Sequence, residues 1–128
     1  MPDKPLILIV DDSITLRATV RATLEKSGFS IEEAENGQKG IEKIDEIYKQ
    51  GRKISLIYSD IYMPEMDGIA FIRNVKQSAY KFIPIIVLTT ESQQSKKMEG
   101  KEAGAAGWLL KPFSSEMLIN IARKFIRT

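Results

Sequence analysis

Apolar runs alternate with longer amphipathic segments from one end of the chain to the other, and this alternation limits the folds that it can adopt. The short runs fit buried strands, and the longer segments carry the spacing of helices. Such alternation is typical of an α/β domain, in which a helix joins each strand to the next. Right-handed crossovers then predict a doubly wound, five-stranded parallel sheet with five helices. Periodicity alone leaves the order of the strands open.

The strands are expected at residues 6–10, 31–35, 54–59, 84–88 and 108–110. The second is polar and charged, which suits an edge of the sheet. The third is apolar enough to be buried on both faces. The helices are expected at residues 13–26, 38–49, 69–77, 91–103 and 114–127.

Local signals support several of these boundaries. Ser13 suits an N-cap and Gly28 a stop after the first helix, while Asn36-Gly37 indicates a turn. The fourth helix is expected to be weak, because Gly100 interrupts it at a cost of about 1 kcal/mol relative to Ala.

The last helix has a clear apolar face and two apolar residues outside it. At 100° per residue, Ile119 and Ile126 fall away from the main face, which predicts a second surface that contacts a partner. The main face consists of Met117, Leu118, Ile121, Ala122 and Phe125.

Polar side chains stand at or just past the ends of four of the expected strands. Asp11 and Asp12 follow the first strand, Asp60 the third, Thr89 the fourth and Lys111 the fifth. In a parallel α/β sheet these ends share one rim, where ligands bind. Three carboxylates, a hydroxyl and an ammonium on one rim predict a site for a divalent cation and a phosphoryl group.

Composition removes many other functions. The chain has 128 residues, the size of one domain, and its 19 Lys and Arg against 17 Asp and Glu give a net charge of +2. That balance does not favour nucleic acid, and neither a membrane span nor a signal peptide is evident, so we expect a cytoplasmic protein. The lack of Cys and His excludes thiolate, Ser-His and imidazole chemistry within the chain. Any phosphohistidine must therefore come from a partner.

Taken together, the motifs resemble the receiver domain of two-component response regulators, and closely the stand-alone, CheY-like chemotaxis type. Each motif alone is more often structural, but their order along nearly the whole chain is specific. The resemblance implies a flavodoxin-like sheet in the order 2-1-3-4-5, which is the order of CheY itself. It also implies a single receiver domain at residues 1–128 with no output domain. The motifs are Asp11-Asp12, Asp60, Met63-Pro64 with Asp67-Gly68, Thr89, and Lys111-Pro112.

The resemblance also implies roles for the residues at the rim. Asp60 would be the phosphoacceptor. Mg²⁺ would bind directly to Asp12, Asp60 and the backbone carbonyl of Tyr62, while Asp11 would act mainly through metal-bound water. Lys111 would pair with Asp60 in the empty site and with the phosphate in the loaded one.

The switch is expected to involve two further side chains. Thr89 would bind a phosphoryl oxygen, and Trp108 would fill the space that Thr89 leaves when it moves. The family typically has a cis peptide at the position of Lys111-Pro112. Tyr62 and Glu91 depart from the family pattern, at positions that flank the path of hydrolytic water in the family. We expect them to alter the lifetime of the phosphoryl group, in a direction that the sequence leaves open.

The predicted function is a phosphorylation-activated switch that a histidine kinase drives. It would catalyse only its own phosphorylation and dephosphorylation. The surface of helix 4, strand 5 and helix 5 would bind a target, such as a flagellar motor switch component, and a phosphatase is a further possible partner. We expect no nucleic acid or membrane partner, and a monomer for which dimerisation stays open.

Several alternatives remain open at this point. The chain could be a phosphate sink or shuttle, a receiver excised from a larger regulator, or a degenerate receiver that only binds. A phosphatase of the haloacid dehalogenase type ranks lower, because such enzymes need an acid where this chain has Tyr62.

Overall fold

The fold is that of a five-stranded parallel sheet with five helices, as the sequence predicts. The computed structural model describes residues 4–126. The strands lie in the order β2-β1-β3-β4-β5, and every neighbouring pair is parallel. The elements along the chain are β1 (Leu6–Val10), α1 (Ile14–Lys26), β2 (Ser30–Ala34), α2 (Gly37–Lys49), β3 (Leu56–Ser59), α3 (Gly68–Lys76), β4 (Ile85–Thr89), α4 (Gln94–Ala103), β5 (Gly107–Leu110) and α5 (Ser115–Phe125).

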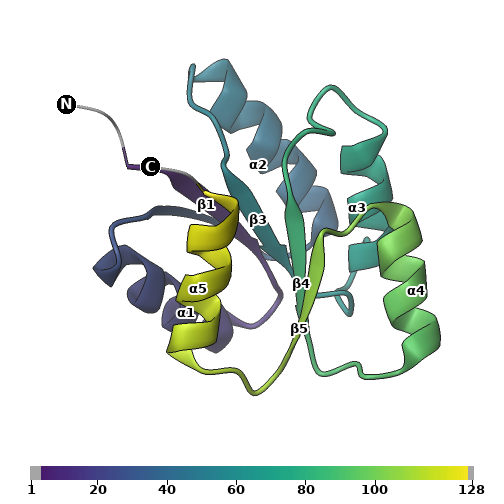
Figure 1. Ribbon diagram of the computed structural model, residues 1–128. Helices are drawn as coiled ribbons and strands as arrows, with labels where there is room; N and C mark the ends of the chain where they lie inside the picture. The colour runs from purple at the N-terminus through teal and green to yellow at the C-terminus, as the bar shows by residue number, and fades with distance from the viewer. Residues whose placement is uncertain (1–3, 127–128) are drawn as a thin grey trace.

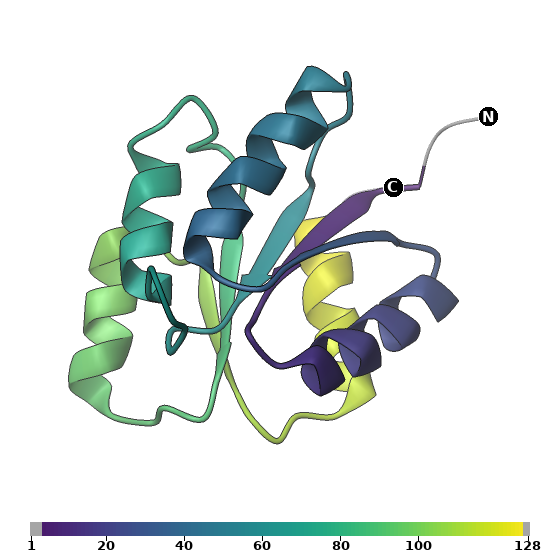
Figure 2. The same ribbon diagram turned by 180° about the vertical axis from the view of Figure 1, so that it is seen from behind.

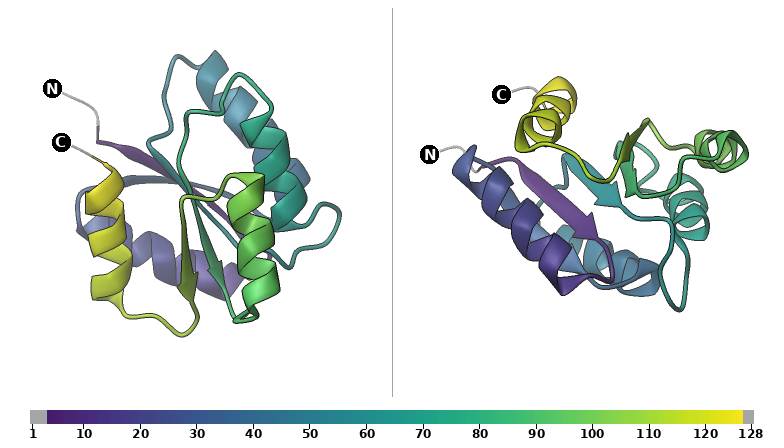
Figure 3. Two further views of the ribbon diagram at one scale, coloured as in Figure 1. Left: turned by 45° about the vertical axis from the view of Figure 1, so that its right-hand side comes forward. Right: turned by 90° about the horizontal axis from the view of Figure 1, so that it is seen from below.

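The sheet separates two helical layers. Helices α1 and α5 cover one face, and α2, α3 and α4 cover the other (Figure 1 and Figure 2). Each face has its own apolar core, because alternate residues of a strand point to opposite sides of the sheet. On β1, for example, Leu8 belongs to the core under α2 and α3, whereas Ile9 belongs to the core under α1 and α5. The views in Figure 3 show the same three layers obliquely and from below.

The ends of α1 and the geometry before α5 agree with the sequence. The Ser13 hydroxyl accepts a hydrogen bond from the Leu16 N–H, so Ser13 is the N-cap of α1. Gly28 has a φ of 96°, which a glycine adopts without strain. The Lys111–Pro112 peptide is cis, which confirms that prediction. No helix within residues 4–126 is long and apolar enough to cross a membrane.

Some boundaries differ from those predicted, and hydrogen bonds explain two of them. Strand β3 begins at Leu56 rather than Ile54, and the Ile54 N–H donates to the Tyr48 hydroxyl at 3.1 Å. Helix α2 begins at Gly37 rather than Gln38, and Asn36, in the bend before it, is the N-cap whose side chain accepts a hydrogen bond from the Lys39 N–H. Strand β2 lies one residue earlier than expected.

Helix α4 begins three residues later than the predicted start at Glu91. The Glu91 carboxylate accepts hydrogen bonds from the Gln93 N–H and the Tyr62 hydroxyl, so this segment forms a loop instead of a first helical turn. The structure agrees with the expected weakness of this helix, because the side chain of its N-cap, Gln93, makes no capping hydrogen bond.

The prediction of a second apolar surface on α5 is wrong. Ile119 packs against the core, and Ile126 is 7% exposed and belongs to it. The helix ends at Phe125, and Ile126 has an extended backbone with a φ of −110°, so helical spacing does not apply to it. The exposed large apolar residue of α5 is instead Met117, at 49%. The predicted helix end at Arg127 lies outside the described residues.

Two arginines of α1 anchor the edge strand β2. Arg17 Nε lies 2.9 Å from Glu33 Oε1, and Arg21 Nε lies 2.6 Å from Glu33 Oε2. Burial works to raise the pKa of Glu33, but the hydrogen bonds and charges of Arg21 and Arg17 outweigh it, so the pKa lies below its ordinary value of 4.5. An acid whose pKa is lower in the folded state stabilises the fold above its unfolded pKa and loses that effect at lower pH.

We therefore expect Glu33→Gln to reduce the free energy of unfolding at pH 7, and the difference from the wild type to shrink as the pH falls below 4.5. Urea unfolding at pH 7 and at about pH 3.5 measures this difference. Glu102→Gln, at an exposed position of α4 and away from this network, is the control. A difference that stays constant across this pH range would contradict the role assigned to Glu33.

Candidate functional site

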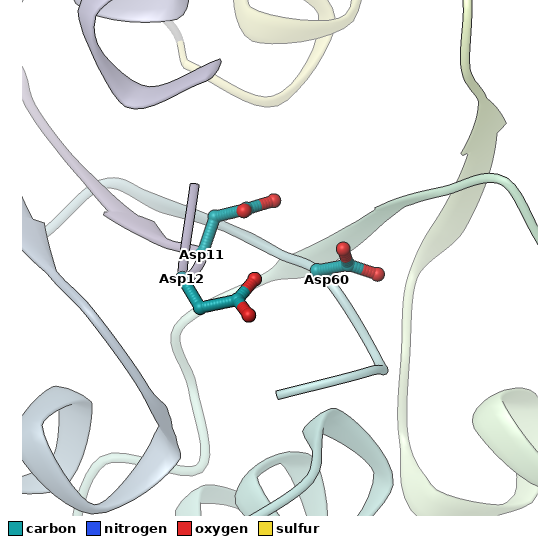
Figure 4. A group of neighbouring side chains, drawn as sticks. All are labelled: Asp11, Asp12 and Asp60. Carbon is teal, nitrogen blue, oxygen red and sulfur yellow. The ribbon is translucent and has the colours of Figure 1, made fainter. Parts of the chain in front are cut away.

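Three carboxylates meet at the C-terminal rim of the sheet. Asp11 and Asp12 directly follow β1, and Asp60 directly follows β3, which is the neighbour of β1 in the sheet. One oxygen from each carboxylate lies within 4.8 Å of the others. Figure 4 shows the three side chains gathered around one space beyond the strand ends. The parallel pairing of β1 and β3 thus produces the acidic cluster.

Lys111 lies between two of these carboxylates. Its Nζ is 3.1 Å from Asp11 Oδ2 and 3.1 Å from Asp60 Oδ2. Burial raises the pKa of Asp11 above its ordinary value of 3.8, although the Ser13 N–H and Lys111 act in the opposite direction. Burial lowers the pKa of Lys111, but the two carboxylates outweigh it and hold the pKa above 10.5. The site therefore keeps a charged ammonium against an excess of negative charge.

The backbone that follows β3 fixes the Asp60 carboxylate. Asp60 Oδ1 accepts hydrogen bonds from the Ile61 N–H at 2.7 Å and the Tyr62 N–H at 3.3 Å. The Gly68 N–H donates to the Ile61 carbonyl at 2.8 Å, which brings the start of α3 against this turn. A Cβ at Gly68 would lie 2.0 Å from the Asp60 carbonyl oxygen, so only glycine fits there. The Asp67-Gly68 motif is therefore part of the site's support as well as a cap of α3.

The Asp11 side chain and backbone are both held by α1. The Ser13 N–H donates to Asp11 Oδ1 at 2.8 Å, and Arg17 Nη1 donates to the Asp11 carbonyl at 2.6 Å. Sequence reasoning missed Arg17, because nothing in the chain's pattern indicates that its guanidinium turns toward the strand end. Its spacing of four residues from Arg21 was the available signal, since it places both on one helix face.

Thr89 and Trp108 meet through the loop after β4. Thr89 is fully buried at the end of β4, and its hydroxyl accepts a hydrogen bond from the Glu91 N–H at 3.3 Å. The Trp108 indole N–H donates to the Glu91 carbonyl at 3.0 Å. A Cβ at Gly100 would lie 2.8 Å from the indole ring, so this glycine makes room for Trp108. The sequence interpretation treated Gly100 only as a weak point of the helix. The structure shows that a glycine is needed there for the indole to pack.

The Tyr62 hydroxyl donates to the Glu91 carboxylate. This bond joins the loop after β3 to the loop after β4. Tyr62 is half exposed, at 50%. The two residues that depart from the family pattern are therefore partners of one another, while their effect on phosphoryl lifetime stays a prediction.

The acidic cluster fits a hard divalent cation. Mg²⁺ prefers oxygen ligands in octahedral geometry and keeps several waters, so it needs few protein groups. Carboxylate oxygens from three residues within 4.8 Å provide such a donor set, and one ammonium does not neutralise three carboxylates. The residues present are therefore compatible with a Mg²⁺ site.

Comparisons with known proteins agree with this arrangement. The response regulator receiver domain family matches residues 7–123. The chain belongs to this family. The match supports the receiver and not the haloacid dehalogenase-type phosphatase that the sequence left as a lower-ranked alternative. Receiver domains are signalling proteins of two-component systems rather than conventional enzymes.

Individual receivers resemble the chain over nearly its whole length. The structure of the Vibrio cholerae chemotaxis protein CheY4 superimposes with a TM-score of 0.85 at 41% identity, and covers 96% of this chain and 99% of that one. A putative response regulator from Chloroflexus aurantiacus gives a TM-score of 0.86 at 29% identity, with 96% and 98% covered.

Curated relatives match as parts of longer proteins. The sensor histidine kinase CheAY of Helicobacter pylori is 36% identical over an alignment of 128 positions that covers 98% of this chain and 15% of the kinase. The transcriptional regulatory protein ResD of Bacillus subtilis is 35% identical over 121 residues, or 94% of this chain and 48% of ResD. The chain thus spans about half or less of the length of these relatives.

Proposed function

We propose that the chain is a phosphorylation-activated switch in which Asp60 accepts a phosphoryl group from a partner histidine kinase. The observation that carries this proposal is the position of the Asp60 carboxylate. It lies beside two further carboxylates and 3.1 Å from the Lys111 ammonium. A carboxylate nucleophile for phosphoryl transfer needs such charge compensation, because the phosphoryl group is itself negative.

Asp12, Asp60 and the Tyr62 carbonyl would hold Mg²⁺, with Asp11 acting mainly through a water ligand. When bound, Mg²⁺ would offset the negative charge of the phosphoryl oxygens. In the transfer, a bond forms between an Asp60 oxygen and phosphorus, and the bond between phosphorus and the donor's imidazole nitrogen breaks. Lys111 then exchanges its contact with the Asp60 carboxylate for a phosphoryl oxygen, and the Thr89 hydroxyl donates to another. The chain would catalyse only this reaction and the hydrolysis that reverses it.

The signal would leave the site through the loop that contains Glu91. Thr89 contacts the Glu91 N–H and Trp108 contacts the Glu91 carbonyl, so movement of Thr89 toward a phosphoryl group alters the support of the indole. Exposed large apolar residues occur on α4, β5 and α5, namely Met98, Leu110 and Met117 respectively. This α4–β5–α5 surface would bind the target.

The likeness to a chemotaxis protein supports a target in chemotaxis, such as a flagellar motor switch component, and a cytoplasmic location. A histidine kinase would be the donor and a phosphatase a further partner. Pull-down of a candidate target by the chain, with and without a small acyl phosphate, tests the partner independently of the chemistry.

Removal of the Asp12 carboxylate is expected to change metal-dependent labelling and stability in opposite directions. We expect Asp12→Asn to abolish Mg²⁺-dependent labelling by a small acyl phosphate. In the presence of a chelator, we expect the same variant to melt a few degrees above the wild type, because it carries less mutual repulsion at the rim. Labelling and thermal unfolding, each with Mg²⁺ and with EDTA, measure the two effects.

Asp45→Asn, on α2 and away from the rim, is the control for this experiment. Wild-type labelling that persists in EDTA would contradict a metal-dependent site. An Asp12→Asn melting temperature at or below that of the wild type in EDTA would contradict the repulsion.

A further inference from the structure

Two arginines on α1 bind the same carboxylate but differ in their contact with the site. Arg17 and Arg21 lie one helical turn apart, and each donates through Nε to one oxygen of Glu33. Arg17 also donates through Nη1 to the backbone carbonyl of Asp11, at 2.6 Å. Arg21 instead uses its Nη1 to bind Glu25, farther along α1. Both arginines therefore anchor β2, but of the two it is Arg17 that also contacts the acidic rim.

The carbonyl that Arg17 binds has a special position. It belongs to the peptide group between Asp11 and Asp12, so its orientation directs the backbone from which both carboxylates project. The Asp11 carboxylate has further partners in the Ser13 N–H and Lys111. Within residues 4–126, the Asp12 carboxylate has no hydrogen bond or ion pair, so the backbone provides its main constraint.

Arg17 is itself held firmly. Its side chain is 14% exposed, and that of Glu33 is 26% exposed. A planar guanidinium can bind a carboxylate and a carbonyl at once in fixed relative directions, which an ammonium cannot do. The Glu33 carboxylate, which Arg17 shares with Arg21, offsets part of the charge of Arg17. Arg17 contacts the rim through a neutral carbonyl, so its effect there is one of geometry more than of charge.

We propose that Arg17 is a positioning residue for the divalent cation site, and that it acts through the Asp11 carbonyl to hold the Asp11–Asp12 peptide in the orientation that cation binding needs. This inference rests on the proposed function, because it takes Asp12 to be a ligand. It is the backbone equivalent of the outer hydrogen bonds that orient metal ligands in other sites. The competing explanation is that Arg17, like Arg21, only fastens α1 to β2.

Mg²⁺ affinity decides between these explanations. Isothermal titration calorimetry of the whole chain is expected to give Arg17→Gln a Kd for Mg²⁺ about tenfold weaker than that of the wild type. Arg21→Gln is expected to stay near the wild-type Kd. Both variants lose a bond to Glu33, so urea unfolding in EDTA is expected to show a similar loss of stability in each. Equal Mg²⁺ affinity in the two variants would overturn the inference.

Arg17→Lys keeps the positive charge but lacks the planar guanidinium that fixes the relative directions of the two bonds, and it serves if Arg17→Gln does not fold. We expect its Kd to lie between those of the wild type and Arg17→Gln. Wild-type affinity in Arg17→Lys would show that charge is enough and would overturn the positioning role. Failure of the wild type to bind Mg²⁺ would overturn the proposed function and this inference together. Normal wild-type binding with equal Arg17→Gln and Arg21→Gln affinities would overturn this inference alone.

Discussion

Asp60→Asn is expected to reduce labelling of the chain by a small acyl phosphate to background, with Mg²⁺ present. The amide keeps the shape of the side chain but is not a nucleophile, and it lacks the charge that holds Lys111 at 3.1 Å. Mass spectrometry of the intact chain would measure the added phosphoryl group. The chain has one tryptophan, Trp108, so its fluorescence reports the loop around Glu91 in the same sample.

We expect the wild-type fluorescence to change on labelling and that of Asp60→Asn to stay constant. Asp45→Asn, which alters an acid on α2, should behave as the wild type in both measurements. Labelling that survives in Asp60→Asn would remove Asp60 as the acceptor. Confirmed labelling without a fluorescence change would leave Asp60 in place and contradict the switch assigned to Trp108.

Gly68→Ala is expected to destabilise the chain by about 3 kcal/mol or more. The new Cβ would lie 2.0 Å from the Asp60 carbonyl oxygen and 2.5 Å from the Ile61 Cα, both of which are backbone atoms. No rotamer change relieves such an overlap, so α3 or the turn after β3 must move. Because that turn donates two N–H groups to the Asp60 carboxylate, labelling should fall as well. Urea unfolding and the labelling assay measure the two losses.

Gly51→Ala is the control that distinguishes the cost of steric overlap from the cost of an unfavourable backbone conformation. Gly51 has a φ of 78° with nothing within 4 Å of an added Cβ, so alanine there costs about 1 kcal/mol for its left-handed backbone alone. We expect Gly51→Ala to keep full labelling. A loss of stability in Gly68→Ala no larger than that in Gly51→Ala would contradict the close packing of α3 on the site.

The strands and helices could be predicted because each depends on local patterns. The runs that form β1, β3 and β4 are apolar on both faces, and the structure buries every one of their residues. Predictions failed where a side chain from a neighbouring element accepts a hydrogen bond from a backbone group, as Tyr48 does from the Ile54 N–H. They also failed where a helix ends early, as α5 does before Ile126. Periodicity contains no information about either event.

The candidate site was visible in the sequence in part. Parallel strands place their carboxyl ends on one rim, so Asp11, Asp12 and Asp60 were expected on the same edge of the sheet. The pairing of β1 with β3 brings the three together. The supporting groups were not visible. Arg17 reaches the Asp11 carbonyl and Tyr62 reaches Glu91 through side-chain directions that depend on the packing of α1 and of two loops.

By itself, the sequence determined the class of fold, the rim on which the acids gather and the kind of cation that they suit, because these follow from strand periodicity and residue chemistry. The tertiary structure decided which groups touch. It placed Lys111 between Asp11 and Asp60, brought Gly68 against the Asp60 carbonyl and gave Arg17 a contact that Arg21 lacks. These contacts join residues far apart in the chain or depend on a side chain's rotamer, and such choices are made only when helices and strands pack together.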